Sequence, residues 1–383
     1  MEPRHGVTSG ATLARSVPLV DLEVVHEPLV AELRAAFERV LASSTFVGGH
    51  EVERFEQALA ERVSVPHAVA VGSGTAALHL ALQAARIGRG DEVVLPPNTF
   101  FATAEAVVAA GATPVLADVD EATALLDPDA VEAAITGRTA AIAAVHLYGQ
   151  PVDGDRFRAI AQRHGLFLLE DAAQALGAAW RGRPAGSLGH GAAFSFYPCK
   201  NLGALGDGGA VTTADAELAR RVRLLRSHGE ESRGVHVLSG FCERLDELQA
   251  AFLTAKLPYL RAAQAARVAA VASYRSRLES LEEVGALETA VGADHAHHLL
   301  VVRVPDRDRV LASLAAAGIG ASVHYRRPIH LQPAFPELGS RGQFPRAEEL
   351  ADSILSLPLY PGITEAQIDR CVGALSDALD AGA

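Results

Sequence analysis

The chain has 383 residues, enough for one large domain and one smaller one. Its formal charge of −12 excludes a general nucleic-acid binder, which would present a basic face. No apolar run could span a membrane and the N-terminus lacks a signal-peptide core, so we expect a cytoplasmic protein. The three cysteines have no metal-ligand spacing, so neither a metal site nor a disulfide framework is predicted.

Predicted elements begin with two amphipathic helices at 26–44 and 51–63, where apolar residues recur at helical spacing. Apolar strand patterns and helical patterns then alternate. These segments lie at 67–88, 91–111, 113–119, 139–149, 153–165, 166–177, 192–198, 208–213 and 215–229. Such an alternation is typical of an α/β fold with a mostly parallel sheet that is covered on both faces.

The pattern changes near residue 255. It predicts a long helix, a strand, a helix, a strand and a final helix, at 257–281, 297–304, 308–318, 319–325 and 364–379. We therefore expect three parts: an N-terminal arm (1–20), a large domain (21–255) and a small α+β C-terminal domain (256–383).

Lys200 lies between an aromatic strand and a glycine-rich turn, in "SFYPCKNLGALGDGGAV". It is one of only two lysines, although the chain holds 34 basic Lys and Arg residues. Arginine keeps its proton too firmly to become a nucleophile, whereas a neutral lysine amine can form a Schiff base with a carbonyl. Composition alone also allows an ordinary surface cation, so the choice depends on the residues around Lys200.

Other candidates follow the ends of predicted strands, where parallel sheets bind their ligands. Gly74 and Thr75 open a helix in "VGSGTAAL", a place that suits either an anion or a simple helix cap. Ser195 could reach a phosphate or bond within its strand. Neither a Walker A sequence nor a dinucleotide fingerprint is present, which argues against an NAD-binding protein.

Asp171 follows a buried strand in "LLEDAAQALG", and Gln174 lies one turn later on the same side. Asp171 could cap a helix, or it could hold a protonated ring nitrogen. Phe100, in "PPNTFF", could pack in the core or stack on a ring. An anion cup, a carboxylate, an aromatic and a lysine together are what pyridoxal 5′-phosphate (PLP) needs, since its ring drains electrons from the reacting carbon.

Seven segments of the sequence resemble the DegT/DnrJ/EryC1/StrS family of sugar aminotransferases, over nearly the whole chain. They are "GSGTAALHLAL", "PPNTFFATAEAV", "HLYGQPVD", "EDAAQALGA", "GSLGHGAAFSFYPCKNLGALGDGGAV", "ERLDELQAA" and "HYRRPIHLQPAF". The resemblance implies the aspartate aminotransferase fold of fold type I PLP enzymes. It also implies a homodimer whose active sites are shared between subunits.

The resemblance assigns roles to ten residues. Lys200 would carry PLP and Asp171 would contact its ring nitrogen, and these two are the expected catalytic residues. Further cofactor contacts would come from Gly74, Thr75, Phe100, Gln174 and Ser195. The sugar nucleotide would lie at His324, Tyr325 and His330. Arginines near these segments are candidates for its diphosphate, namely Arg226, Arg233, Arg326 and Arg327.

Two positions depart from the family pattern. Cys199 precedes Lys200, where a small or hydroxyl residue is usual. Cys242 replaces an asparagine that, in many members, crosses to the cofactor phosphate of the partner subunit. A thiol donates hydrogen bonds more weakly than an amide, so Cys242 is left out of the expected cofactor set.

The expected activity is transfer of an amino group, from L-glutamate by resemblance, to a nucleotide-linked keto sugar. A 3- or 4-keto-6-deoxyhexose on a dTDP carrier is favoured, in the synthesis of an antibiotic or other secondary-metabolite sugar. Lys200 argues against the family's sugar 3-dehydratases, which have histidine there. Two alternatives stay open: a ketocyclitol aminotransferase and a non-catalytic regulatory protein on the same fold.

Overall fold

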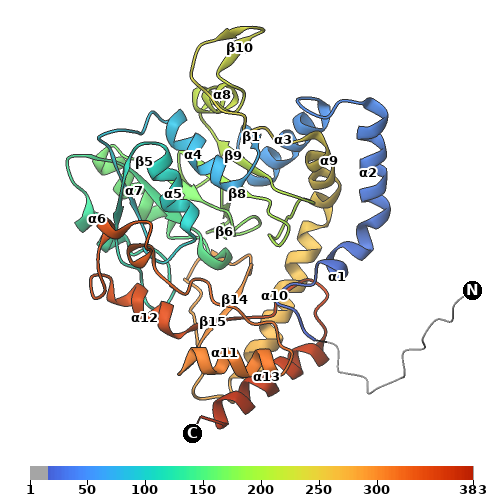
Figure 1. Cartoon of the computed structure of the whole chain (residues 1–383), viewed down its shortest axis with the longest axis vertical. Coiled ribbons are helices and arrows are strands. Elements are labelled where there is room, and N and C mark those ends of the chain that lie inside the picture. The colour runs from blue at the N-terminus through green and yellow to red at the C-terminus, as the bar shows by residue number, and fades with distance from the viewer. Residues whose placement is uncertain (1–15, 383) are drawn as a thin grey trace, which may run out of the picture.

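The computed structural model describes residues 16–382 (Figure 1). The strands are β1 His67–Val71, β2 Glu92–Leu95, β3 Thr113–Leu116, β4 Thr139–Val145, β5 Phe167–Asp171, β6 Ala179–Trp180, β7 Arg183–Pro184, β8 Gly191–Ser195, β9 Gly209–Thr213, β10 Glu230–Ser232, β11 Val235–His236, β12 Gly285–Ala286, β13 Ala293–Asp294, β14 Leu300–Arg303 and β15 Ile354–Leu357. The α-helices are α1 Leu22–His26, α2 Val30–Ser43, α3 His50–Val63, α4 Gly74–Ala84, α5 Phe101–Ala109, α6 Pro128–Ala134, α7 Gly154–His164, α8 Ala216–Leu225, α9 Glu247–Lys256, α10 Leu260–Leu278, α11 Arg307–Ala316, α12 Pro345–Ser353 and α13 Glu365–Asp380. Short 3₁₀ helices lie at Glu27–Leu29, Leu147–Gly149, Leu257–Tyr259, Ile329–Leu331 and Pro336–Leu338.

A seven-stranded sheet forms the centre of the molecule, in the order β1-β9-β8-β5-β4-β2-β3. The neighbours β2-β3, β2-β4, β4-β5 and β5-β8 are parallel, whereas β9 runs antiparallel to both β1 and β8. The carboxyl ends of β1, β2, β4, β5 and β8 therefore lie at one edge. The predicted α/β fold with a mostly parallel sheet is confirmed.

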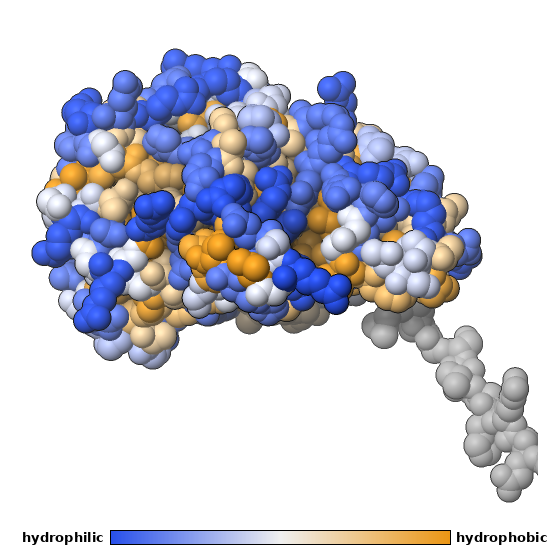
Figure 2. Space-filling model, turned by 90° about the horizontal axis from the view of Figure 1, so that it is seen from above, coloured by the Kyte–Doolittle hydropathy of each residue, from blue (hydrophilic) through white to orange (hydrophobic). Residues whose placement is uncertain are grey.

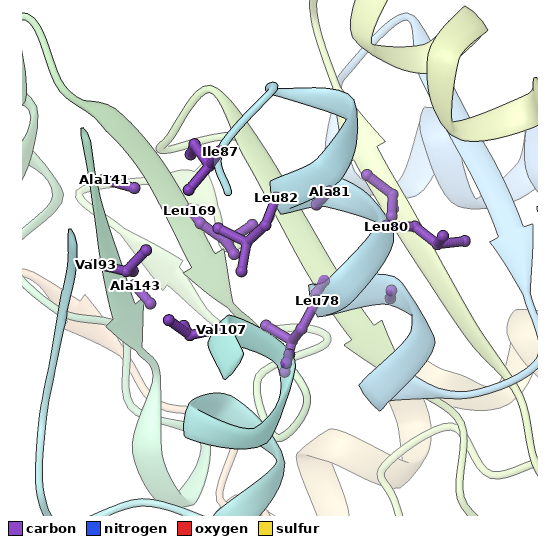
Figure 3. Packing of buried hydrophobic residues seen from close by; sticks show 14 of the residues in the cluster. Leu78, Leu80, Ala81, Leu82, Ile87, Val93, Val107, Ala141, Ala143 and Leu169 are labelled. Atoms are coloured by element: carbon purple, nitrogen blue, oxygen red, sulfur yellow. The ribbon is translucent and has the colours of Figure 1, made fainter. Parts of the chain in front are cut away.

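Helices cover both faces of this sheet, as its apolar strands require. Val69 and Val71 of β1 pack in one cluster with α4, α5 and α8, and Figure 3 shows Leu78 and Leu82 of α4 over that face. The alternate residue Ala70 faces α3 and α9 on the other side. Further along that side, α6 and α7 pack against β2, β4 and β5. Each strand thus buries side chains in two directions.

A smaller antiparallel sheet, β12-β14-β15, lies against α10, α11 and α13. The three helices predicted here are confirmed, but the strand predicted at 319–325 is wrong. Ile319 bridges Val17 and Ser322 bridges Ser356, so the segment pairs with two different partners and forms no ladder of its own. β14 pairs instead with β15, which lies within a segment expected to be a loop.

Most of the predicted N-terminal arm, residues 1–15, lies outside the described residues. Its end is packed, because Val17 is fully buried and pairs with Ile319. Within 16–382, no helix has both the length and the apolar composition needed to cross a bilayer. The domain boundaries at residues 20 and 255 stay predictions.

The buried ring of Phe55 in α3 contacts the ring of Phe196, which follows β8, with centroids 5.2 Å apart. A substitution of Phe55 therefore tests the packing of the core on this side of the sheet. We expect Phe55→Ala to lower the free energy of unfolding by about 3–5 kcal/mol, since it leaves a cavity. Urea denaturation measures this. Val291, which is 93% exposed, provides the control, and Val291→Ala should change the value by less than about 0.5 kcal/mol. Equal effects of the two substitutions would contradict this packing.

Candidate active site

The carboxyl edge of the central sheet opens into a cavity of about 460 Å³. Turns after β1, β2, β4 and β5 line it, together with the loop between β8 and β9. Nine of the predicted site residues lie in its wall: Gly74, Thr75, Phe100, Asp171, Gln174, Ser195, Lys200, His324 and Tyr325. Segments far apart in sequence thus meet where the parallel strands end.

The start of α4 forms an anion cup in this wall. Ser73 caps the helix, because its hydroxyl accepts a hydrogen bond from the amide of Ala76 at 3.0 Å. The earlier amides, of Gly74 and Thr75, stay available at the positive end of the helix dipole. A Cβ on Gly74 would come within 2.6 Å of the Ser195 Cβ, so glycine is required for this close approach. The cup suits a phosphate group.

Asp171 ends β5 and is buried in the floor of the cavity. The hydroxyl of Thr103 donates to its Oδ2 at 2.7 Å, and the amide of Ala173 donates to Oδ1 at 3.2 Å. Because Thr103 uses its proton on Asp171, the 3.0 Å contact between the Thr99 and Thr103 hydroxyls requires Thr99 to donate. Sequence reasoning missed Thr103. The sequence offered one indication of it, a hydroxyl residue in the first turn of a helix that begins at the carboxyl edge of the sheet.

Gln174 connects the sheet to the segment at 324–325. Its Oε1 accepts from the amide of Tyr148 at 2.6 Å, and its Nε2 donates to the hydroxyl of Tyr325 at 2.9 Å. Tyr148 in turn donates to the backbone oxygen of His324. The ring of Tyr325 lies 5.6 Å from that of Phe100. Burial raises the pKa of Tyr325, so its phenol stays protonated.

Lys200 lies on the loop between β8 and β9, in a turn where its amide donates to the oxygen of Tyr197 at 2.8 Å. Burial lowers the pKa of its amine, while Cys199 and Asp171 act in the opposite direction. The neighbouring His298 and His324 stay neutral. Burial lowers both their pKa values, and the Lys200 charge lowers them further; that of His324 falls to about 4. The amine therefore has no competing imidazolium beside it.

Comparison with known proteins shows which family has this arrangement of site residues. The family model described as the DegT/DnrJ/EryC1/StrS aminotransferase family matches residues 28–376. The chain belongs to this family. It is 47% identical to the erythromycin biosynthesis sensory transduction protein EryC1 of Saccharopolyspora erythraea, over 94% of this chain and 98% of that one.

A Streptomyces venezuelae transaminase, named for dTDP-3-amino-3,4,6-trideoxy-alpha-D-glucose, is 46% identical over 94% of this chain and 96% of its own. The crystal structure of S. venezuelae DesV, described as a complex with a ketimine intermediate, superposes with a TM-score of 0.93. That pair is 46% identical and covers 95% of this chain and 98% of DesV. The chain is thus a PLP-dependent transaminase with the aspartate aminotransferase fold.

The residues present fit the cofactor of this family. The cup at α4 offers amides and, with Ser195, a hydroxyl at one end of the cavity, and Asp171 offers a carboxylate in its floor. Phe100 supplies an aromatic face, and Lys200 supplies an amine whose pKa is lowered by burial. The cup would bind the phosphate of PLP, Asp171 its pyridine nitrogen and Lys200 its aldehyde carbon.

Five of the predicted residues are not in the cavity wall, namely His330, Arg226, Arg233, Arg326 and Arg327. His330 lies in the 3₁₀ helix Ile329–Leu331 and is buried, with its Nε2 3.1 Å from Oε1 of Glu348, so its ring does not line the cavity. Arg226 is paired with Glu56, and Arg326 with Asp308. Within 16–382, Lys200 is the only Lys or Arg in the lining.

The two departures from the family pattern occupy different places. Cys199 lines the cavity beside Lys200. Cys242 is exposed outside it, where the guanidinium of Arg244 donates to its sulfur at 3.1 Å. Sequence reasoning missed further polar residues of the lining, among them Thr99, His146, Tyr197, Asp207 and His298. Of these, Asp207 had a signal, since it interrupts the glycine-rich turn after Lys200.

The lowered pKa of Lys200 predicts its reactivity. Because the pKa is lowered, the neutral, nucleophilic form of the Lys200 amine becomes the major form at a lower pH than it does for an ordinary lysine. In the cofactor-free protein, we expect acetic anhydride at trace amounts to label Lys200 with a midpoint below the ordinary value of about 10.4. Peptide mass spectrometry across a pH series measures this against free Nα-acetyl-lysine as an internal standard. A midpoint at or above that of the standard would contradict the effect of burial.

Proposed function

We propose that this transaminase transfers an amino group from L-glutamate to the keto carbon of a nucleotide-linked sugar. The favoured acceptor is a 3- or 4-keto-6-deoxyhexose on dTDP, in the synthesis of an antibiotic or other secondary-metabolite sugar. The observation that carries the proposal is that Lys200 and Asp171 line one cavity together with an anion cup. The relationship to a dTDP-amino-sugar transaminase supports the choice of carrier.

PLP, when bound, supplies an aldehyde that joins the amino group and a ring that withdraws electrons from the reacting carbon. The cup at Gly74, Thr75 and Ser195 would hold its phosphate. Asp171, oriented by Thr103, would keep the ring nitrogen protonated. Lys200 would carry the cofactor and then, once displaced, move a proton to and from the donor α-carbon as base and acid. Burial suits this task, because it brings the amine closer to its neutral form at working pH.

The segment at 324–325 would bind the sugar. The Nδ1 of His324 forms a hydrogen bond with the Ser356 hydroxyl at 2.8 Å. The other ring nitrogen, Nε2, has no hydrogen-bond partner among residues 16–382 and could bind the sugar. Tyr325 is held by Gln174 and faces Phe100. The hydrogen bonds that fix both residues connect back to the turn after β4. A sugar bound here would therefore stand in a fixed place relative to Lys200.

The charge of the cavity supports a homodimer with shared sites. L-Glutamate and the sugar diphosphate are both anions, but Lys200 is the only Lys or Arg in the lining within 16–382. A second copy would supply the missing cations. Figure 2 views the end of the molecule where the hairpin β10-β11 projects, and Arg233 lies at that hairpin's turn. The half-exposed Val235 and Val237 beside it are suited to contact another chain.

A two-step assay tests the proposed function. The PLP-loaded protein should lose its yellow colour when L-glutamate is added, and a dTDP-keto sugar should restore the colour and yield the dTDP-amino sugar. Lys200→Ala should abolish turnover, and Lys200→Arg should fare no better, because a guanidinium does not lose its proton. Substantial residual turnover in either variant would overturn the role of Lys200. Activity with a ketocyclitol and none with keto-sugar nucleotides would favour that alternative acceptor.

Because Cys242 has a thiol where many family members have an amide, we expect the protein to bind PLP with lower affinity than those members do. We expect Cys242→Asn to bind PLP more tightly, because an amide is a better donor to a phosphate across a subunit interface. Equilibrium dialysis of the cofactor-free proteins measures the dissociation constant. Cys242→Ser is a matched control of nearly the same size. Equal PLP affinity in the wild-type and Asn proteins would refute the prediction.

A further inference from the structure

The second lysine of the chain, Lys256, lies behind the loop that carries Lys200. It ends α9 and is 6% exposed. Its ammonium donates one hydrogen bond to the backbone oxygen of Gly203 and another to Nε2 of His26, at 2.9 Å. Lys256 therefore joins three separate segments: the end of α9, the Lys200 loop and α1.

The loop that carries Lys200 is a thin wall between two cavities. Cys199 and Lys200 line the active-site cavity of about 460 Å³. The same two residues line a second cavity of about 480 Å³, whose other walls come from α1 and from the start of α10. Close packing normally fixes a segment in one place. With a cavity on each side, this segment depends more heavily on hydrogen bonds.

Several hydrogen bonds hold the loop. Within it, the amide of Ala204 donates to the oxygen of Phe196 at 2.8 Å and closes its base. Side chains also connect it to other segments: Asn201 bonds the oxygen of Ala296 and the ring of His298, and Gln249 accepts from the amide of Leu205. The bond from Lys256 to the oxygen of Gly203 is the one among these whose donor is a charged ammonium. Charge-assisted hydrogen bonds are roughly twice as strong as neutral ones. Lys256 therefore provides the strongest single restraint among them.

We propose that Lys256 is a positioning residue for Lys200: by holding the Gly203 oxygen, it sets where the Lys200 amine stands in the cavity. The proposal rests on the proposed role of Lys200 as cofactor carrier. Burial lowers the pKa of Lys256 to about 8, so the ammonium form predominates at neutral pH. The site needs a compact cation that donates in two directions, which the longer planar guanidinium cannot replace. This explains why an arginine-rich chain keeps a lysine here.

Lys256→Met tests the proposal, because it keeps the length of the side chain and removes its donors. In the cofactor-free protein, we expect hydrogen exchange of the amides at 200–204 to rise by about tenfold. In the loaded enzyme, kcat should fall between about tenfold and about hundredfold, because misplacement of a reacting group lowers the rate. The KM for the sugar nucleotide should change little, since its proposed site lies on another segment.

Arg307→Met provides a matched control. Like Lys256, Arg307 is a buried cation; it donates to the backbone oxygens of Ala351 and Ile354 and pairs with Asp308, but it lies in the small sheet region. It should lower the melting temperature about as much as Lys256→Met and leave kcat and loop exchange unchanged. A Lys256→Met protein that loses melting temperature alone, with wild-type kcat and exchange, would overturn the proposal.

Lys256→Arg keeps the test open if Lys256→Met does not fold. It retains the charge, and we expect it to fold yet to show the same direction of change in exchange and kcat. Wild-type values for both in Lys256→Arg would overturn the proposal. The exchange measurement needs no turnover, so it stands even if the proposed acceptor is wrong. Lys200→Ala separately tests whether Lys200 has the role on which the proposal depends.

Discussion

The shared direction of β1, β2, β4, β5 and β8 brings the polar residues of this transaminase together. Each strand is mostly apolar and has polar residues at or after its carboxyl end, so parallel alignment places five such turns at one edge. The antiparallel β9 completes the arrangement. It starts at Gly209, where any Cβ would clash with the backbone oxygen of Ser73. The anion cup and the Lys200 loop can therefore lie against each other only because this position is glycine.

Burial controls the chemistry of the cavity as strongly as direct contacts do. The Lys200 amine and the His324 and His298 rings are all shifted towards their neutral forms by loss of water. Asp171 is buried too, and hydrogen bonds from Thr103 and Ala173 hold its carboxyl group in place. The cavity thus combines an amine of lowered pKa with a firmly oriented carboxyl group.

Hydrogen bonds also connect the parts of the chain on which the site is built. Gln174 and Tyr148 attach the segment at 324–325 to the turns after β4 and β5. Lys256 connects the Lys200 loop to α9 and α1 from behind. The amine and the proposed sugar site are thus fixed by separate sets of bonds. A change in one set can affect the rate without affecting substrate affinity, or the reverse.

The sequence by itself determined the α/β class and most helices, because apolar periodicity is a local signal. Strand-end motifs and the family resemblance together identified nine of the residues that line the cavity. Tertiary structure decided the rest. The strand predicted at 319–325 failed because its partners, Val17 and Ser356, come from distant segments. His330 lies away from the cavity because its loop turns inward towards Glu348. The contacts of Thr103 with Asp171 and of Lys256 with Gly203 join residues 68 and 53 positions apart. Such pairings depend on how the whole chain packs, and no local pattern encodes them.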